Sequence, residues 1–459
     1  MGPLDLGVVA AYLAATVWLG IRSTRRPAER TEDYLVAGRT LSLPAFVVAL
    51  VATWYGGVLG VGEYTYLHGL SNWLVLGVPY YVGALLFAVL FAKKARLSAE
   101  YTVPDLLFET YGRGAGTVGT LTVLVLSLPA AYLLMLGVLL RRMTGWDQRL
   151  AIAACALFCL AYIAARGFRS VVQTKGLQFA FMYGGFALLL PVAVWSAGGW
   201  TFLERGLPAE HFTWDGGQGA GYVVAWYFIA LQTLVEPTFY QRCFAARGPK
   251  TARNGILVSI LFFALFDGLT TITGMYARAL LPGLPSGVDA FPALGELLLP
   301  AALLGVFYAG MIATIMSTVD SFLFVGGVTL GRDLVWRLCG GKADQLFWTR
   351  AGLVVVTAVS AGIAMASESV VALWYGFYSV GTATLLPPLV GTFYPSLRPA
   401  PRFAAWGMAI SGGLTLAWVL GREAAGRPWL GIEPIYAGLA VAAATHLAGV
   451  LAARRNVVN

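Results

Sequence analysis

Thirteen apolar segments, most of them about twenty residues long, recur along this chain and leave only short stretches between them. A helix needs about 20 mostly apolar residues to cross the hydrocarbon core of a bilayer. The predicted spans are 5–21, 43–67, 73–92, 116–140, 148–165, 172–197, 220–241, 255–281, 298–331, 351–366, 370–394, 402–420 and 432–453. The pattern therefore predicts an all-α integral membrane protein, with residues 1–459 forming a single membrane domain.

Composition supports the same conclusion. Hydrophobic residues make up 58% of the chain and charged residues 12%, whereas soluble domains carry about 25% charged residues. The 55 glycines are typical of helices that approach one another closely in lipid. The lipid bilayer is thus the expected surrounding of this chain, and neither a nucleic acid nor an obligate protein partner is expected.

Residues that carry enzymatic chemistry are scattered. The sequence shows no cluster of His, Cys and carboxylate residues typical of a metal site and no Gly-rich phosphate loop. The cysteines lie in or beside apolar segments, where small buried residues are expected; they are Cys155, Cys159, Cys243 and Cys339. We therefore do not expect an enzyme.

The distribution of Lys and Arg predicts the orientation, because these residues are most frequent in cytoplasmic loops. With the N-terminus outside and the C-terminus in the cytoplasm, most of the 31 basic residues fall on the cytoplasmic side. The exceptions are Arg141, Arg142, Arg149, Arg205, Arg278, Arg422 and Arg427. A multi-pass protein of the cell membrane with this orientation is therefore expected.

Two of the predicted spans are interrupted. The second span contains Gly56 and Gly57 directly after Trp54-Tyr55, and paired glycines weaken a helix. The seventh contains Pro237, which removes a backbone donor. Non-helical backbone is tolerated inside a membrane only where it lines a cavity or is buried in protein. Two such breaks, five spans apart, indicate a transporter's binding site, although each could also be a kink without a ligand.

Six short motifs occur in order along the chain. They read DYLVAGR at 33–39, ATWYGG at 52–57, TVPDL at 102–106 followed by YG at 111–112, YQRCFAA at 240–246, MSTVDS at 316–321 and RDL at 332–334. In these motifs the chain resembles the sodium:solute symporter family, whose members carry proline, pantothenate, sugars, sialic acid, iodide or choline. The resemblance covers nearly the whole chain.

The resemblance implies a leucine-transporter-type fold and sodium-coupled import of a small organic solute by alternating access. In that fold the helix at 5–21 is peripheral. Two five-helix repeats, at about 43–241 and 220–394, meet near residue 220 and are related by inverted symmetry. The helices within 402–453 are peripheral. The two interrupted spans would be the first helices of the two repeats.

The resemblance also implies a sodium site between the second and ninth spans. Its ligands would be the backbone carbonyls of Ala52, Tyr55 and Thr314 and the hydroxyls of Ser317 and Thr318. Sodium is a hard cation that binds oxygen ligands, and all five of these ligands are oxygens. The alternative for a Ser-Thr pair in a membrane helix is hydrogen bonding to the carbonyl four residues earlier.

Three further residues are candidates for the ion path or for coupling: Lys175, Gln178 and Asp320. The family commonly has an aspartate at the position of Lys175. An ammonium there could replace a second cation and favour one sodium per cycle, or it could lie near the cytoplasmic helix end and extend to the lipid headgroups. Asp320 is a carboxylate inside the ninth span, where such groups are usually functional, and its partner is open.

The expected solute contacts lie near the two breaks and in the eleventh span. The candidates are Trp54, Gly56, Gly57, Glu236, Tyr240 and Trp374. Trp54 and Trp374 resemble tryptophans with which choline carriers hold a quaternary ammonium through cation–π attraction, and Glu236 would add charge attraction. We therefore predict a cationic or amine-bearing solute. The alternative is that Glu236 pairs with a nearby lysine and the tryptophans only pack.

Other function classes remain as alternatives. A proton-coupled carrier of the same fold is the nearest, and a transporter-like sensor without transport is the second. A channel fits two interrupted helices at a closed site less well than a carrier does. Substrate identity, sodium stoichiometry and oligomeric state are open at this point.

Overall fold

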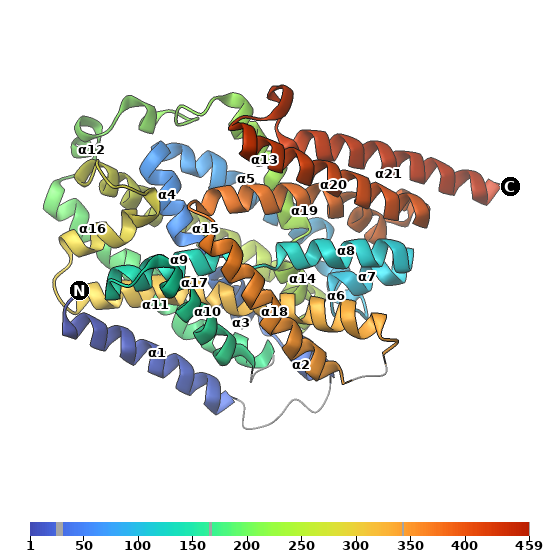
Figure 1. Cartoon of the computed structure of the whole chain (residues 1–459), viewed down its shortest axis with the longest axis horizontal. Helices are drawn as coiled ribbons and strands as arrows, with labels where there is room; N and C mark the ends of the chain where they lie inside the picture. Colours follow the sequence, from blue (N-terminus) through green and yellow to red (C-terminus); the bar gives the residue numbers. More distant parts are fainter. Residues whose placement is uncertain (24–30, 165–167, 342–343, 459) are drawn as a thin grey trace.

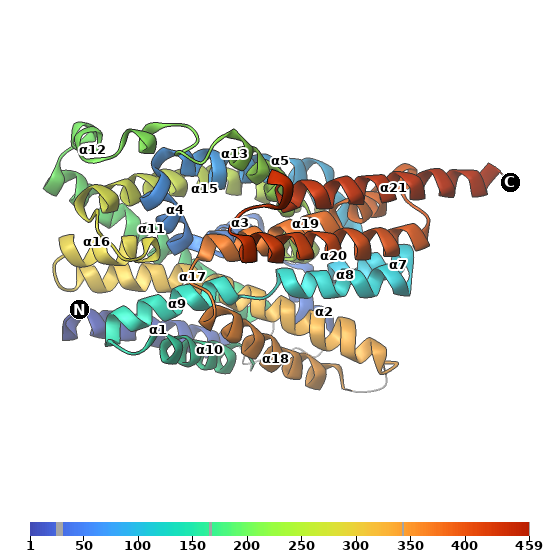
Figure 2. The ribbon, with the colours of Figure 1, turned by 45° about the horizontal axis from the view of Figure 1, so that its top comes forward.

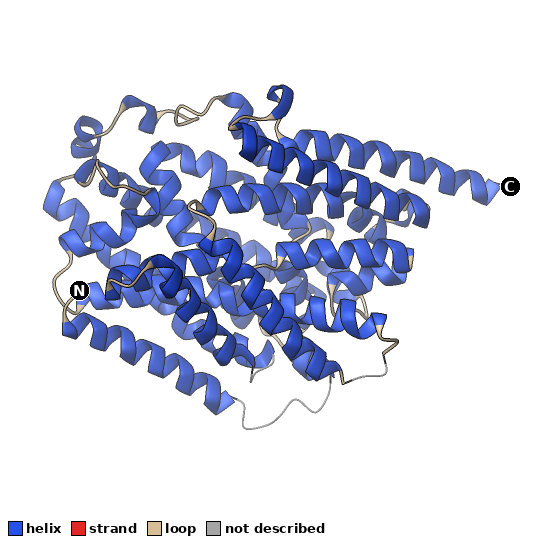
Figure 3. Cartoon of the chain, in the orientation of Figure 1, coloured by secondary structure: helices blue, strands red, loops and turns tan. Residues whose placement is uncertain are grey.

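The computed structural model describes residues 1–23, 31–164, 168–341 and 344–458. Within these ranges the chain is helical and contains no β-strand (Figure 3). An isolated parallel bridge joins Leu41 to Ala246. The predicted all-α membrane architecture is therefore confirmed for the described part of the chain.

The described ranges contain 21 α-helical segments. The N-terminal half contains α1 (Pro3–Ser23), α2 (Thr31–Val36), α3 (Leu43–Trp54), α4 (Val58–His68), α5 (Val78–Leu90), α6 (Ala92–Leu97), α7 (Val103–Tyr111), α8 (Arg113–Leu126), α9 (Ala130–Thr144), α10 (Gln148–Ala164), α11 (Phe168–Ala197) and α12 (Trp200–Gly206). The C-terminal half contains α13 (Ala220–Ile229), α14 (Pro237–Ala245), α15 (Pro249–Leu280), α16 (Ala290–Leu298), α17 (Leu303–Val328), α18 (Gln345–Met365), α19 (Val370–Phe393), α20 (Pro401–Ala425) and α21 (Pro434–Val458).

Eleven helical segments in the described residues are long and apolar enough to cross a membrane. The predicted count of thirteen is therefore not confirmed. The two missing segments have separate causes: α10 is a shorter apolar helix, and the predicted span 220–241 is divided into α13 and α14. Residue 165, the predicted end of the fifth span, lies outside the described residues.

Helix α17 is the centre of the bundle. The apolar stretch of α17 is buried along its whole length, whereas most residues in the apolar stretches of α1 and α21 are not buried. Helix α1 packs against α11 and α17, and α20 and α21 pack against each other and against α19. Figures 1 and 2 show α1 and the α20–α21 pair on opposite sides of the bundle. A helix that is apolar on all faces is expected at such a central position.

The first interrupted span forms a tight turn at the predicted place. Helix α3 ends at Trp54, a single 3₁₀ turn covers Tyr55–Gly57, and α4 follows. The backbone at Gly57 (φ −76°, ψ 19°) departs from α-helical geometry without becoming extended. The expected unwinding is therefore limited to one tightened turn.

The second interrupted span breaks more completely. A 3₁₀ segment, Ala230–Leu234, follows α13, and Glu236 is extended (φ −64°, ψ 112°) before α14 begins at Pro237. Proline disfavours the helical conformation in the residue before it, which explains the extended Glu236. Proline is tolerated at the first helical position because the missing N–H has no helical partner there.

A third break was not predicted. The sequence analysis treats 116–140 as one span, but α8 ends at Leu126 and α9 begins at Ala130. Pro129 stands between them and cannot donate a backbone hydrogen bond. A Cβ on Gly326 would lie 3.2 Å from the backbone oxygen of Ser127, so this break packs closely against α17.

Several motif residues that are far apart in the sequence meet in the structure. Asp105 lies 3.0 Å from Arg332 and also accepts from Arg337, and Arg332 pairs with Asp333. The Thr102 side chain and Asp105 form a capping box at the start of α7. These contacts join α7 to the π-helical segment Thr329–Trp336, which follows α17 directly. The motif residues Asp105 and Arg332 therefore connect helices.

Candidate functional site

Oxygen atoms from α3 and α17 meet where the first helix break begins. The Ser317 hydroxyl donates to the backbone oxygen of Ala52 and lies 3.0 Å from that of Thr314. The Thr318 hydroxyl donates to the backbone oxygen of Thr53. Four of the five predicted sodium ligands, Ala52, Thr314, Ser317 and Thr318, are fully buried in this contact region. Both hydroxyls reach across to α3, unlike the purely intrahelical alternative.

Tyr55, the fifth predicted ligand, begins the 3₁₀ turn of the first break. The next residue, Gly56, faces α17: a Cβ at this position would lie 1.8 Å from the Thr318 hydroxyl oxygen. Only a residue without a side chain allows the break to approach α17 so closely. The Tyr55 carbonyl stays a predicted ligand.

Arg242 is a fully buried cation that joins three helices beside these oxygens. Its guanidinium donates to the hydroxyls of Thr53 and Ser321, both at 2.8 Å, and to the backbone oxygen of Thr238 at 3.1 Å. The sequence analysis counts Arg242 among the cytoplasmic basic residues, but the structure places it inside the bundle. The guanidinium holds α14 against α3 and α17.

Lys175 is the second cation at this place. Its side chain is 0% exposed, and its ammonium donates to the backbone oxygen of Ser317. The alternative in which Lys175 extends to the lipid headgroups is therefore wrong, because α11 directs this side chain against α17. Asp320 and Arg242 are the charged groups that act electrostatically on it. Asp320 is itself fully buried on α17.

Gln178 lies one turn after Lys175 on α11 and is also fully buried. Its side-chain amide makes no hydrogen bond within the described part of the chain. An amide buried without a partner is costly, so Gln178 remains a candidate for contact with an ion or a water molecule near Lys175.

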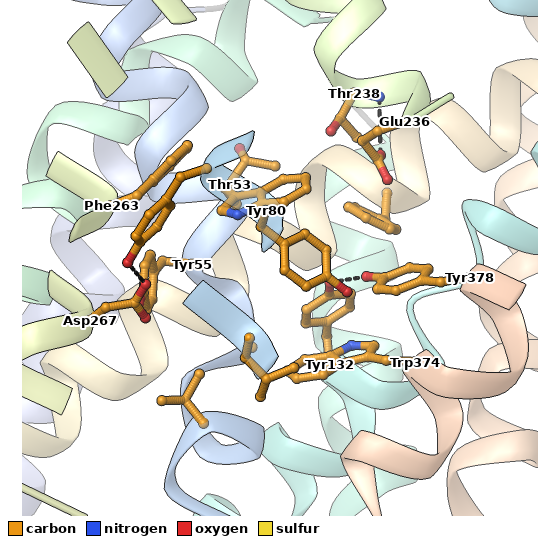
Figure 4. Close-up of a pocket in the computed structure, with 16 residues that line it drawn as sticks. Thr53, Tyr55, Tyr80, Tyr132, Glu236, Thr238, Phe263, Asp267, Trp374 and Tyr378 are labelled. Carbon is orange, nitrogen blue, oxygen red and sulfur yellow. Dashed lines mark hydrogen bonds between the residues drawn. The ribbon is translucent and has the colours of Figure 1, made fainter. Parts of the chain in front are cut away.

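A cavity lies against both helix breaks (Figure 4). Of the predicted solute contacts, Trp54, Gly57, Glu236 and Trp374 line it. Thr53, Tyr55, Val61, Leu76, Tyr80, Tyr81, Tyr132, Thr238, Phe263, Asp267, Phe322 and Tyr378 complete the lining. Most of its wall is aromatic, and every basic residue among those described lies outside the lining.

Glu236 reaches the cavity because the second break turns its backbone away from the helix. Its carboxylate accepts from the Thr238 backbone N–H at 3.2 Å, as the N-cap of α14, and from the Gln232 amide. Arg242 acts electrostatically on it. In the described part of the chain these hydrogen-bond partners contact the Glu236 carboxylate and no lysine does, so the predicted pairing with a lysine is not observed there.

Trp374 lies on the glycine face of the first break. A Cβ on Gly57 would lie 2.2 Å from its ring, and one on Gly60 would lie 2.6 Å away. Trp54 packs edge-on against Phe239, with ring centroids 4.8 Å apart. The two tryptophans are therefore fixed by packing and also face the cavity.

Two predicted solute contacts lie elsewhere. Gly56 faces Thr318, as described above, and Tyr240 is fully buried behind the cavity. The Tyr240 hydroxyl donates to the backbone oxygen of Leu234 at 2.9 Å, and its ring stacks on Phe393. Neither residue lines the cavity.

The sequence analysis missed Asp267 and the tyrosines of the cavity wall. Asp267 is a lone carboxylate in the apolar sequence of α15, so the rule that singled out Asp320 applied to it as well. The tyrosines are Tyr80, Tyr81, Tyr132 and Tyr378, and nothing in their local sequence distinguishes them from packing residues.

The sequence of this chain is similar to those of known sodium-coupled transporters. The sequence model described as the sodium:solute symporter family matches residues 34–408. The chain is 24% identical to the sodium/pantothenate symporter of Escherichia coli (strain K12), over 74% of this chain and 73% of that protein. It is 24% identical to a sodium/mannose cotransporter of Bos taurus (88% and 77% covered) and 22% identical to the high affinity choline transporter 1 of Homo sapiens (89% and 73% covered).

Solved structures show the same fold. A Na⁺-coupled sialic acid symporter in a substrate-bound outward-open state superposes with a TM-score of 0.79 at 16% identity, covering 99% of this chain and 98% of that chain. The nucleobase-cation-symport-1 family transporter MHP1, in a closed conformation, gives a TM-score of 0.62 at 12% identity, covering 92% and 94%. The predicted leucine-transporter-type fold is thereby confirmed.

Proposed function

Because the chain belongs to the sodium:solute symporter family, we propose that it is a sodium-coupled secondary transporter that imports a small amine-bearing solute by alternating access. The repeats at about 43–241 and 220–394 would move relative to each other around the site. We place the N-terminus outside and the C-terminus in the cytoplasm of the cell membrane.

Coupling between sodium and solute is supported by one observation: the oxygens predicted to bind sodium lie next to the cavity predicted to bind the solute. The backbone oxygens of Ala52 and Thr53 contact the hydroxyls of Ser317 and Thr318, and the next residue, Trp54, lines the cavity. An ion that holds Ala52 against Ser317 also fixes the position of Trp54. Each ligand then raises the affinity of the other, by a coupling free energy of typically about 1–3 kcal/mol.

The negative charge of the cavity supports an amine-bearing solute. Glu236 provides a carboxylate at the second break, and the rings of Trp54 and Trp374 face the same space. A cation over a tryptophan face is attracted by the ring quadrupole, more strongly when water is excluded. An ammonium group satisfies both contacts.

Lys175 supports transport of one sodium per cycle. Its ammonium contacts the backbone oxygen of Ser317 and keeps a fixed positive charge beside the ion oxygens, in place of a second mobile cation. Each charge that enters with an inside-negative potential gains about 2.3 kcal/mol per 100 mV, so a single sodium already drives accumulation.

The first prediction concerns sodium dependence. Purified protein in liposomes should take up a radiolabelled amine when an inward sodium gradient is imposed, with a Hill coefficient for sodium near one. Replacing sodium by potassium at fixed pH should abolish uptake. The double variant Ser317→Ala/Thr318→Ala should reduce uptake by roughly a hundredfold, because it removes two of the predicted oxygen ligands of the ion.

Thr357→Ala is the matched control. This α18 hydroxyl is buried and donates to the Leu353 oxygen of its own helix, so its loss should leave uptake unchanged. Uptake that persists in potassium and follows a pH gradient would instead assign the protein to proton-coupled carriers of the same fold. Binding of a solute without any uptake would favour a sensor.

A further inference from the structure

Asp267 is a buried carboxylate in the middle of α15 to which the ion site gives no role. The residue is 2% exposed, and its side chain lines the cavity. The Tyr81 hydroxyl donates to one of its oxygens, and a Cβ on Gly77 would lie 3.2 Å from the same oxygen. The carboxylate is thus held in a defined position between α15 and the start of α5.

Asp267 and Glu236 lie on opposite sides of the same cavity (Figure 4). The 16 lining residues include these two carboxylates and no lysine, arginine or histidine. Arg242 interacts electrostatically with Glu236 but does not line the cavity. Glu236 and Asp267 accept hydrogen bonds from Gln232, Thr238 and Tyr81, but a buried carboxylate that forms no ion pair is still costly. The cavity therefore favours an occupant that brings positive charge to both sides.

The wall between the carboxylates suits the body of such an occupant. Tyr80 and Tyr132 lie between Asp267 and Tyr378 in Figure 4, with Glu236 above Tyr378 and Trp374 below it. The hydroxyls of Tyr132 and Tyr378 lie 3.5 Å apart. Aromatic faces pack against methylene groups and attract the ammonium groups attached to them.

A second polar group near Asp267 lacks a protein partner. The Tyr55 hydroxyl is buried and makes no hydrogen bond within the described part of the chain. Its ring lies beside Asp267 in Figure 4 and packs on Phe266 at 4.4 Å. A buried hydroxyl without a partner calls for a ligand or water to complete it, and Tyr55 is one of the residues that line the cavity.

We propose that the solute is an aliphatic diamine, with one ammonium at Glu236 and the other at Asp267, and with its methylene chain along the tyrosine wall. This inference rests on the proposed function and specifies its substrate class. Two carboxylates on opposite sides of the cavity balance the two solute charges. Asp267 is then a specificity-determining residue that distinguishes diamines from monoamines.

The experiment compares diamines with monoamines of the same chain length in the liposome assay. Labelled 1,4-diaminobutane and 1,5-diaminopentane are tested with butylamine and pentylamine as matched monoamines. The wild-type protein should prefer the diamine at least tenfold, since a hydrogen-bonded charge pair contributes about that factor or more. Asp267→Asn should remove this preference by weakening diamine uptake at least tenfold while leaving monoamine uptake within about twofold.

Glu204→Gln serves as the control for loss of one acidic charge, because Glu204 is exposed on α12, outside the cavity lining. Sodium-dependent thermal stabilisation of Asp267→Asn shows that the variant is folded. Equal uptake of diamines and monoamines by the wild type would overturn the diamine assignment and leave sodium-coupled amine transport intact. A change in sodium stoichiometry with unchanged selectivity would overturn it in favour of an ion site. Uptake of no amine at all would overturn the proposed function as well.

Discussion

Position 56 shows how one residue controls the contact between the first helix break and α17. A Cβ on Gly56 would lie 1.8 Å from the Thr318 hydroxyl oxygen and 2.2 Å from the Thr318 Cβ. Rotation of the side chain moves the hydroxyl oxygen but not the Cβ, which is bonded to the backbone, so the clash cannot be relieved by rotation alone. The absence of a side chain at position 56 is therefore a requirement of this close contact between the first break and α17.

Gly56→Ala should raise the sodium concentration needed for half-maximal uptake at least tenfold. Overpacking of a close contact costs about 1–3 kcal/mol, and here that cost separates the oxygens of α3 from those of α17. The measurement is the sodium dependence of uptake in liposomes. Gly413→Ala on α20 is the control, because a Cβ there meets no atom within 4 Å. An unchanged sodium dependence in Gly56→Ala would contradict the role of this contact.

At the scale of elements, the Asp105 carboxylate connects α7 to the π-helical segment Thr329–Trp336, which follows α17 directly. Asp105 is 3% exposed, caps α7 together with Thr102, and accepts from Arg332 and Arg337. Asp105 and Arg332 belong to motifs more than two hundred positions apart. The ion pairs therefore fix how two elements that are distant in sequence pack at one end of the bundle.

Asp105→Asn should lower the midpoint of thermal unfolding in detergent by several degrees. An asparagine keeps the capping geometry, but the charge that faces Arg332 is lost, and breaking a buried ion pair costs about 3–5 kcal/mol. Glu109→Gln on the same helix removes an exposed charge and should leave the midpoint unchanged. If both variants melt together with the wild type, the ion pairs do not stabilise the packing of α7.

At the scale of the whole molecule, the oxygens that are predicted to bind sodium come from helices that are far apart in the sequence. Ala52 belongs to α3, and Thr314, Ser317 and Thr318 belong to α17, which is buried at the centre of the bundle. An ion bound between them stabilises the folded bundle as a unit, because the separated helices do not hold these oxygens together.

Sodium should therefore raise the thermal unfolding midpoint of the purified protein, whereas potassium at equal ionic strength should not. At a sodium concentration of about 100 times its dissociation constant the stabilisation is about 2.7 kcal/mol. The sodium increment should vanish in Ser317→Ala. Equal stabilisation by both cations would mean that ionic strength, not a sodium site, is responsible.

The sequence by itself determined those features that depend on short stretches of chain. Run length and hydropathy located the membrane helices. Gly56-Gly57 and Pro237 located two breaks, because missing side chains and a missing N–H act on the local backbone. The same reasoning missed the break at Pro129, which was absorbed into an apolar run. At 220–241 it located the break but counted two short helices as one membrane span.

Only the tertiary structure decided which side chains face one another. Arg242 reads as a cytoplasmic charge and Lys175 as a residue at a helix end, yet both are buried against α17. Asp267 is a single carboxylate in an apolar helix until the packing of α15 places it across the cavity from Glu236. The physical reason is that the direction of a side chain depends on the rotation of its helix against its neighbours, which is set by contacts between segments far apart in the sequence.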